Sequence, residues 1–264
     1  SVKNPRSLAQ MVQRMCMATA SAAYAQMKEI VDHSFEGVTY GLNNMSEFIR
    51  QNVKEIKAAA NNPAGAVFAF NPYQDRNLYG GAFIMSAGSA SPIPEGKAMV
   101  DTFGDDKIMA YFGDPDSQVA LTADGLYSAL GISVGDMCTI CFIAKNDTDA
   151  TGTFGFVRLK AKASGTTTLT SANYSTYFDV ESNLPIIGGN VNGGQITFQV
   201  TVAGVVEDGE IEYCAIHSVK ANNGWLRSNA IMKVNGYTLA PAFEDAIATY
   251  PVGESYVLNG GNIE

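Results

Sequence analysis

The clearest alternation of apolar and polar residues in the chain lies between Gln195 and Ala203. Every second residue is apolar, which is typical of a strand with one face in a core and the other in water. Asp208-Gly209 follows as a two-residue turn signal, and another apolar run begins at Glu210. The pattern therefore predicts a meander of antiparallel strands. The apolar positions of its first strand are Ile196, Phe198, Val200 and Val202.

The segment from Glu210 to Val234 is predicted to form two strands joined at Asn223-Gly224, because Asn-Gly is the strongest short hairpin signal. With these two residues at the centre of the turn, Ala230 lies opposite His217. One face of the hairpin is then mostly apolar and should point toward a core, whereas the other is polar. The first face holds Tyr213, Ala215, His217, Val219, Ala221, Leu226, Ser228, Ala230, Met232 and Val234, and the second holds Arg227, Asn229 and Lys233.

Two amphipathic helices are predicted near the start of the chain. Ser7 with Gln10 forms a capping box, after which apolar residues recur at helical spacing to about Asp32. Asn44 with Glu47 caps a second helix. The linker between the helices indicates a helical hairpin.

The two predicted helices carry an apolar stripe that is rich in methionine. The stripe is a candidate surface for contact with other subunits, because methionine adapts to varied partners. The simpler interpretation, which ordinary helix burial favours, is that the stripe packs on the β-domain or on the neighbouring helix. The candidate interface residues are Leu8, Met11, Val12, Met15, Met45, Phe48 and Ile49.

Residues 137–264 are predicted to form an antiparallel β-domain, in which the run Met137 to Ala144 is apolar on both faces and should be a central strand. Residues 1–62 form a helical region, and residues 63–136 a mixed linker region with short strands and a helix over Asp124 to Leu130. The predicted fold class is α+β: an N-terminal helical hairpin followed by a mainly antiparallel β-sandwich or sheet domain.

The composition of the chain limits the classes of partner that we expect it to bind. The 264 residues are 46% hydrophobic and carry a net charge of −9, so we expect a globular chain that does not bind nucleic acid, since phosphate binding needs clustered lysine and arginine. The sequence contains no run of ~20 apolar residues, so no membrane span is predicted. No signal peptide is predicted either. Because the sequence begins with Ser1, we expect that its start was removed by processing or that more chain precedes it.

Cys138 and Cys141 have the C-x-x-C spacing of metal and redox sites, but they fall within a predicted strand. Residues three apart on a strand point to opposite faces, so the two thiols cannot easily share a metal or a disulfide. We predict that they are buried small hydrophobic residues. With Cys16 and Cys214, they form no disulfide framework.

The two histidines give little support for catalysis. His33 ends the first predicted helix, and His217 on the inward hairpin face is predicted to be a core histidine with satisfied hydrogen bonds rather than a base. Asp147 and Asp149 begin like a calcium loop, but Arg158 stands at the twelfth position, where a glutamate is needed, so a polar turn is favoured. We predict no catalytic, cofactor or metal site, and we rank a hydrolase acting through acidic loops lowest.

The single tryptophan, Trp225, follows the hairpin turn and is a candidate platform for a sugar ring. A tryptophan beside a turn also packs readily over the neighbouring strand, which is the alternative interpretation.

The opening Val2-Lys3-Asn4-Pro5-Arg6-Ser7, with Gln10 and Arg14 on the helix that follows, resembles a family of uncharacterised proteins of gut bacteria and their tailed phages. The late segments Ile216-His217-Ser218 and Gly224-Trp225-Leu226-Arg227-Ser228 resemble the final hairpin of that family. The resemblance covers the two ends of the chain, not residues 63–136. It implies a helical region followed by an Ig-like β-portion, and no catalytic residues.

The expected function is therefore that of a non-enzymatic virion structural protein: a capsid auxiliary, head-fibre or tail component of a bacteriophage. Its expected partners are further copies of itself and other virion proteins. A secreted or cell-surface carbohydrate-binding module is the alternative, with Trp225 as the residue that would contact the sugar.

Overall fold

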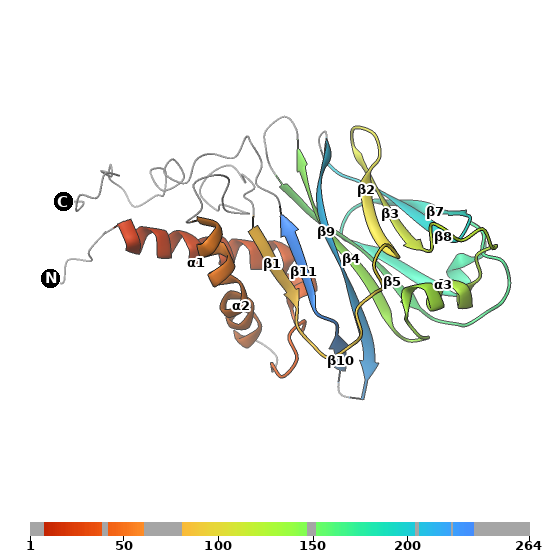
Figure 1. Ribbon diagram of the computed structural model, residues 1–264, viewed down its shortest axis with the longest axis horizontal. Helices are drawn as coiled ribbons and strands as arrows, with labels where there is room; N and C mark the ends of the chain where they lie inside the picture. Colours follow the sequence, from red (N-terminus) through yellow and green to blue (C-terminus); the bar gives the residue numbers. More distant parts are fainter. Residues whose placement is uncertain are drawn as a thin grey trace.

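The computed structural model describes residues 8–38, 42–60, 81–146, 152–203, 206–222 and 224–234. Helices α1 (Leu8–Val31) and α2 (Leu42–Ala60) lie at one end, and the strands with α3 (Ala123–Leu130) form the rest (Figure 1). This order confirms the α+β class. The strands are β1 (Gly81–Ser86), β2 (Ala98–Thr102), β3 (Lys107–Gly113), β4 (Met137–Asn146), β5 (Gly152–Ala161), β6 (Phe178–Ser182), β7 (Ile186–Asn192), β8 (Gln195–Thr201), β9 (Val206–Ala221), β10 (Gly224–Arg227) and β11 (Ala230–Val234).

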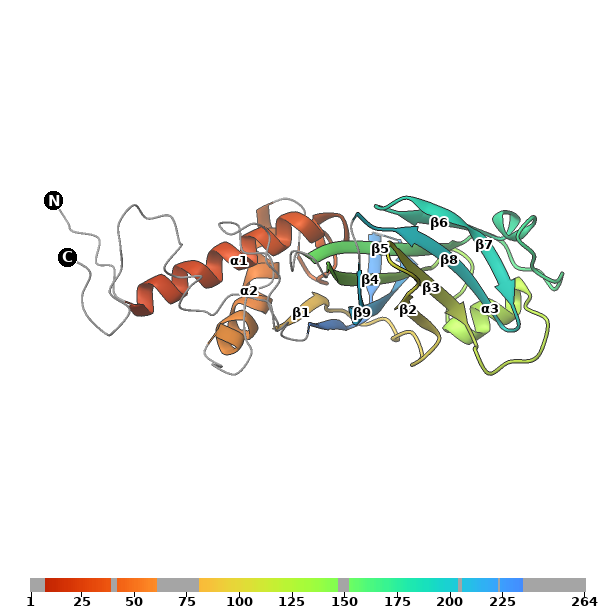
Figure 2. The ribbon, with the colours of Figure 1, turned by 90° about the horizontal axis from the view of Figure 1, so that it is seen from above.

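The elements stack in three layers. The central layer is a five-stranded sheet in the order β10-β9-β4-β5-β6. A four-stranded sheet, β2-β3-β8-β7, packs on one of its faces, and α1, α2 and the two-stranded sheet β1-β11 pack on the other (Figure 2). Every ladder in these three sheets is antiparallel.

Strand β4 is buried on both faces, as its sequence predicts. Cys138 and Phe142 face the four-stranded sheet, whereas Cys141 and Ile143 face the helices. Cys138 and Cys141 thus point into different cores, which confirms the prediction for this pair. All four cysteines are free and buried.

Aromatic side chains fill the core between the two larger sheets. The rings of Phe112 and Phe198 meet edge to face, with centroids 6.2 Å apart. Phe142 lies directly across from Gly155 on the neighbouring strand, and a Cβ at Gly155 would come within 2.3 Å of its Cζ atom. Glycine is therefore required at this position, because any side chain would displace a fully buried ring.

The second core lies between the helices and the central sheet, with Phe48 of α2 at its centre. The Phe48 ring stacks on Phe83 of β1 at 6.5 Å and meets Tyr24 of α1 at 5.8 Å. Met45 and Ile49 are partly buried against the same cluster. The apolar stripe of α2 is therefore used within the chain, which is the simpler of the two interpretations of that stripe.

A buried asparagine closes the open edge of β1. Asn52 of α2 is fully buried, and its Oδ1 accepts a hydrogen bond of 2.7 Å from the Ile84 amide. Its Nδ2 donates to the Ile84 carbonyl at 3.1 Å and to the Phe48 carbonyl at 3.0 Å. The side chain thus replaces a neighbouring strand, and it ties α2 to the sheet through the backbone.

The predicted register of the last hairpin is wrong by two residues. Gly224 pairs with Ala221 and Leu226 with Val219, so Gly224 begins β10 instead of occupying the turn. A shift of two leaves the side chains of β10 on their predicted face, which is why the hydrophobic pattern did not reveal the error. Ala230 and Met232, predicted to share the face of Ala215, are instead buried in the helical core with Cys214 and Ile216. The pairing of Ala230 with His217 is also wrong, because the chain leaves β9 at Ser228 and β11 pairs with β1.

The predicted meander is wrong as well. The amphipathic strand itself is confirmed, since Ile196, Phe198 and Val200 of β8 are buried. However, β8 pairs with β3 and β7 in the four-stranded sheet, while β9 pairs with β4 and β10 in the central sheet. Asp208-Gly209 lies inside β9 and is not a turn. Between β8 and β9 the chain passes from the four-stranded sheet to the central sheet. Short-range turn signals do not indicate such a change of sheet.

Residues 63–136, predicted to be a mixed linker region, supply strands to two of the sheets in the part that the structure describes. Its described part contributes β1 to the pair with β11, and β2 and β3 to the four-stranded sheet with β8. Helix α3 forms where it was predicted, with Thr122 Oγ1 accepting from the Gly125 amide at 3.0 Å and Gly131 ending the helix at φ 65°. The described part of this region therefore shares its sheets with strands from the predicted β-domain.

We predict that Asn52→Ala lowers the free energy of unfolding by about 2–4 kcal/mol, because it leaves the amide and carbonyl of Ile84 buried without partners. Lys54→Ala, at an exposed position of the same helix, should change stability by less than about 0.5 kcal/mol. Urea denaturation followed by circular dichroism measures both. Equal effects of the two substitutions would show that Asn52 does not hold α2 to β1.

Candidate functional site

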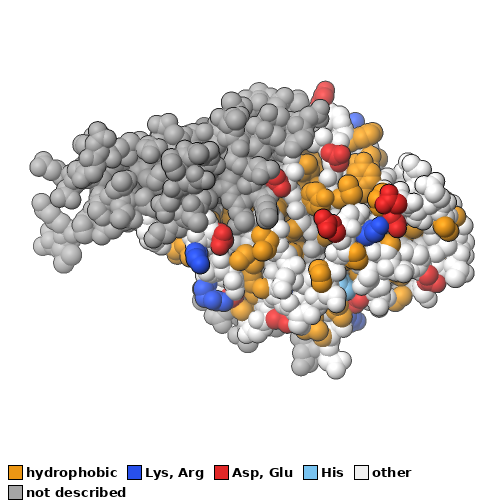
Figure 3. Space-filling view, in the orientation of Figure 1, with side chains coloured by type: hydrophobic (Ala, Val, Ile, Leu, Met, Phe, Trp, Pro, Cys, Tyr) orange, Lys and Arg blue, Asp and Glu red, His pale blue; other side chains and the backbone are white. Residues whose placement is uncertain are grey.

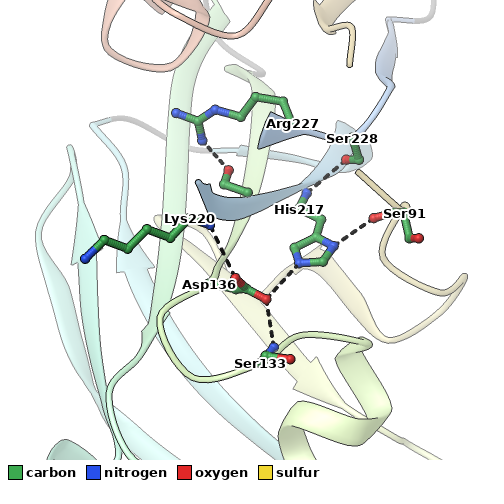
Figure 4. A network of polar contacts seen from close by, with 8 residues as sticks. Ser91, Ser133, Asp136, His217, Lys220, Arg227 and Ser228 are labelled. Atoms are coloured by element: carbon green, nitrogen blue, oxygen red, sulfur yellow. Dashed lines mark hydrogen bonds and ion pairs between the residues drawn. The ribbon is translucent and has the colours of Figure 1, made fainter. Parts of the chain in front are cut away.

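His217 of β9 lies in a buried network of polar contacts (Figure 4). Its Nδ1 lies 2.7 Å from the backbone carbonyl of Ser91, and its Nε2 lies 3.4 Å from Oδ2 of Asp136. The carbonyl and an ionised carboxylate can only accept, so both contacts are hydrogen bonds when both ring nitrogens carry protons. The ring thereby connects β9 with the segment before β2 and the turn before β4.

Asp136 is the second buried ionisable residue of the network. Its Oδ2 also accepts from the Ser133 amide at 2.9 Å, and its Oδ1 faces the Lys220 amide at 3.4 Å (Figure 4). The carboxylate is only 7% exposed and His217 is 4% exposed. A catalytic base must reach a substrate in a plausible pose. This pair is closed to solvent, so it acts as a staple between strands and loops, as predicted for a core histidine.

The backbone of His217 is fastened as well. Its amide donates to Ser228 Oγ at 3.0 Å, and the Ser228 amide donates to its carbonyl at 2.9 Å. Ser86 Oγ donates to the Ser228 carbonyl at 2.6 Å. Ser228 therefore stands at the point where β10 ends and the chain turns away to pair with β1.

The cysteines are placed for packing, not for nucleophilic chemistry. Burial raises the pKa of Cys138 far above its ordinary value. A hydrogen bond with Cys141, which is its direct cross-strand neighbour, raises the pKa of Cys214, and burial adds to the effect. A raised pKa keeps a thiol protonated, and the thiolate is the reactive form.

An open groove of about 1100 Å³ lies between the end of α1 and the central sheet. One wall is the last turns of α1 and the turn that follows, including Glu29, Asp32 and Glu36. The floor is the uncovered end of the helix-facing side of the sheet, with Arg158 on β5 and Trp225 on β10. The groove therefore combines a mainly acidic wall, which also holds Lys28, with a mainly basic and aromatic floor, to which Glu181 of β6 also contributes.

Trp225 and Arg227 project from β10 into the groove, two residues apart and hence on the same face. The guanidinium carbon of Arg227 lies 6.0 Å from the centre of the Trp225 ring. Arg227 Nη1 donates to Ser218, and its buried Nε has no partner among the described residues. Burial and the like charge of Arg158 lower the pKa of Arg227 to about 10.

Arg158 is better satisfied than Arg227. Its Nη1 lies 3.1 Å from Oε2 of Glu181 on β6, and its Nε donates to Thr139 at 3.3 Å. Its guanidinium carbon also lies 5.0 Å from the centre of the Phe156 ring. Lys160, two residues further along β5, is exposed and lines the same groove. Arg158 thus forms an ion pair within the described part of the chain, whereas Arg227 does not.

The structure separates the residues that the sequence singled out. Trp225 lines the groove and is half-buried. Met45, Phe48 and Ile49 pack in the chain's own core, and Phe48 has no exposed surface left. The side chains of Leu8, Met11, Val12 and Met15, as well as Asp147 and Asp149, lie outside the described residues.

Sequence reasoning missed Asp136, Arg158 and Arg227. Asp136 is 81 residues from His217, and no local pattern connects them. Arg227 could have been found, because it alternates with Trp225 on a predicted strand. Arg158 was noted only as a mismatch in a calcium-loop pattern. Among the described residues, no three His, Cys, Asp or Glu side chains are grouped to hold a metal ion.

Comparisons leave the chain without a named relative. No protein family, curated protein or solved structure matches it. No helix in the described ranges is both long and apolar enough to span a membrane.

We predict that His217→Leu lowers the free energy of unfolding by about 2–4 kcal/mol, because it leaves the Ser91 carbonyl and the buried Asp136 carboxylate without the imidazole as a hydrogen-bond partner. Lys220→Ala removes only an exposed side chain and keeps the backbone amide that faces Asp136, so the expected change is below about 0.5 kcal/mol. Thermal and urea unfolding of both variants give the comparison. An unchanged midpoint for His217→Leu would mean that the network adds no stability.

Proposed function

We propose that this protein is a non-enzymatic virion structural protein, a capsid auxiliary, head-fibre or tail component of a bacteriophage. It works by assembling with copies of itself and with other virion proteins. The proposal joins the resemblance of the two ends of the chain to that phage-associated family with the way in which the fold presents its first helix.

Helix α1 carries this proposal. It is 24 residues long, and its amino-terminal part projects past the strands in both views (Figures 1 and 2). Among the α1 side chains that the structure describes, Cys16 is the first that is buried in the helical core. The preceding stripe Leu8, Met11, Val12 and Met15 has the i, i+3, i+4, i+7 spacing of a helix face that packs against a partner.

Exposed side chains on β9 and β11 offer a second area for contacts with other subunits. Ile231 on β11 exposes 53% of its surface and Tyr213 on β9 exposes 38%. Figure 3 shows hydrophobic side chains over the strands, with acidic side chains among them. Exposed apolar and aromatic residues interspersed with charges are typical of protein–protein contact surfaces. Closed symmetric homo-oligomers are the commonest arrangement for subunits of assemblies.

The proposal predicts that the wild-type chain sediments as an oligomer and that Met11→Asp with Met15→Asp converts it to a smaller species. Aspartate in the stripe places two charges in an apolar contact, which is costly to bury. Gln13→Asp, at an exposed position of the same helix, should leave the oligomer intact. Sedimentation velocity measures the size, and circular dichroism checks that α1 remains helical.

A wild-type chain that is a monodisperse monomer and binds no particle protein would contradict this proposal. So would an oligomer that Gln13→Asp dissociates as readily as the stripe variant does.

A carbohydrate-binding module, secreted or on a cell surface, is the second candidate. One observation favours it: Trp225 lines an open groove together with acidic and basic side chains. Aromatic rings that present an apolar face beside polar groups suit sugar rings, which have both kinds of surface. The two functions are compatible, because a particle component can also bind a surface glycan.

The second candidate predicts glycan-array binding that Trp225→Ala abolishes. The matched control is Phe103→Ala, which removes an aromatic ring with 51% exposure that does not line the groove. Loss of binding in both variants, or in neither, would count against a sugar platform at Trp225.

A further inference from the structure

The groove floor places its cations on a single surface. Arg158 and Lys160 alternate along β5 with residues of the sandwich core, so both project toward the helical side of the central sheet. Arg227 reaches the same side, since it bonds to Ser218, which neighbours the helix-facing Ile216 by alternation. Three positive charges therefore meet at the end of the sheet.

One of these charges lacks a counter-charge. Glu181 neutralises Arg158. Arg227 forms no ion pair within the described part of the chain, and its buried Nε has no hydrogen-bond partner there. A buried polar group without a partner costs free energy, and a second guanidinium nearby adds to that cost. An anion bound at Arg227 would remove both penalties.

The surroundings of Arg227 select the kind of anion. The Trp225 ring adjoins the guanidinium, so an apolar surface and a cation are available side by side. The α1 side of the groove holds Glu29, Asp32 and Glu36, together with Lys28. Asp32 Oδ1 already accepts from Tyr24, and Glu36 Oε1 from the amides of Ser89 and Arg227. Each of these two carboxylates keeps a second oxygen that can accept from a hydroxyl group of a ligand. A simple inorganic anion would use neither the ring nor the acidic wall.

We infer that this groove binds an acidic saccharide, with a sugar ring on Trp225, its carboxylate or sulfate at Arg227 and its hydroxyl groups toward the acidic wall of α1. The inference rests on the carbohydrate-binding role proposed above and adds the chemical class of the ligand. Lys160 stands at the exposed rim, where it attracts the negative ligand without being buried by it.

The single tryptophan makes the test direct, because intrinsic fluorescence reports on Trp225 alone. The probes are an oligogalacturonate, which carries carboxylates, a heparin oligosaccharide, which carries sulfates, and a neutral maltohexaose. We expect a saturable fluorescence change with one or both acidic probes and none with the neutral probe. The two acidic probes distinguish a carboxylate ligand from a sulfated one.

Arg227→Gln should weaken binding of the acidic probe by at least about tenfold, since a hydrogen bond to a charged group is lost. Lys107→Gln removes the same charge from an exposed residue of the outer sheet, paired with Asp106, and should leave the affinity unchanged. If Arg227→Gln does not fold, Lys160→Gln serves instead and should weaken binding severalfold. Raising the salt concentration should weaken binding of the wild-type chain.

The outcomes distinguish the acidic-saccharide inference from the carbohydrate-binding role on which it rests. Equal binding of neutral and acidic probes, unaffected by Arg227→Gln or Lys160→Gln, would overturn the acidic-saccharide inference and leave the carbohydrate-binding role standing. A Trp225 signal that responds to no oligosaccharide would reject both.

Discussion

Burial of β4 on both faces is the constraint on which the rest of the molecule depends. A strand with Phe142 on one side and Cys141 and Ile143 on the other must be covered twice. The four-stranded sheet covers the first side, and α1, α2 and the β1-β11 pair cover the second. The helices are therefore part of the same folding unit as the sandwich, and Asn52 secures them by hydrogen bonds to β1. Apolar burial of this kind is the dominant favourable term in folding.

The groove exists because the helical cover is shorter than the sheet. Where α1 ends, the same face that is apolar under the helices becomes polar, and Arg158 and Trp225 replace phenylalanines such as Phe156. These side chains stand on hydrogen-bonded strands instead of mobile loops, so little ordering is needed when a ligand binds. In contrast, His217 and Asp136 lie inside the structure and contribute to its connections.

The errors in strand pairing share one physical origin. Period-two alternation identifies which residues of a strand are buried, and it did so correctly for β8. It is unchanged when a strand slips by two residues or pairs with a different neighbour, as β10 and β11 do. The choice between partners is made by contacts such as Ser86 with Ser228, which are separated by 142 residues.

Local periodicity and capping signals were enough to predict the class of the fold, the central position of β4, the opposite faces of Cys138 and Cys141 and the place of α3. The sequence also singled out Trp225, since a lone tryptophan beside a turn is visible without a structure. Three features could be seen only in the folded chain: which sheet each strand joins, the contact of His217 with Asp136, and the meeting of Trp225, Arg227 and Arg158 with the end of α1. These depend on long-range packing, in which distant segments compete for the same apolar surface, and no short stretch of sequence records which of them prevails.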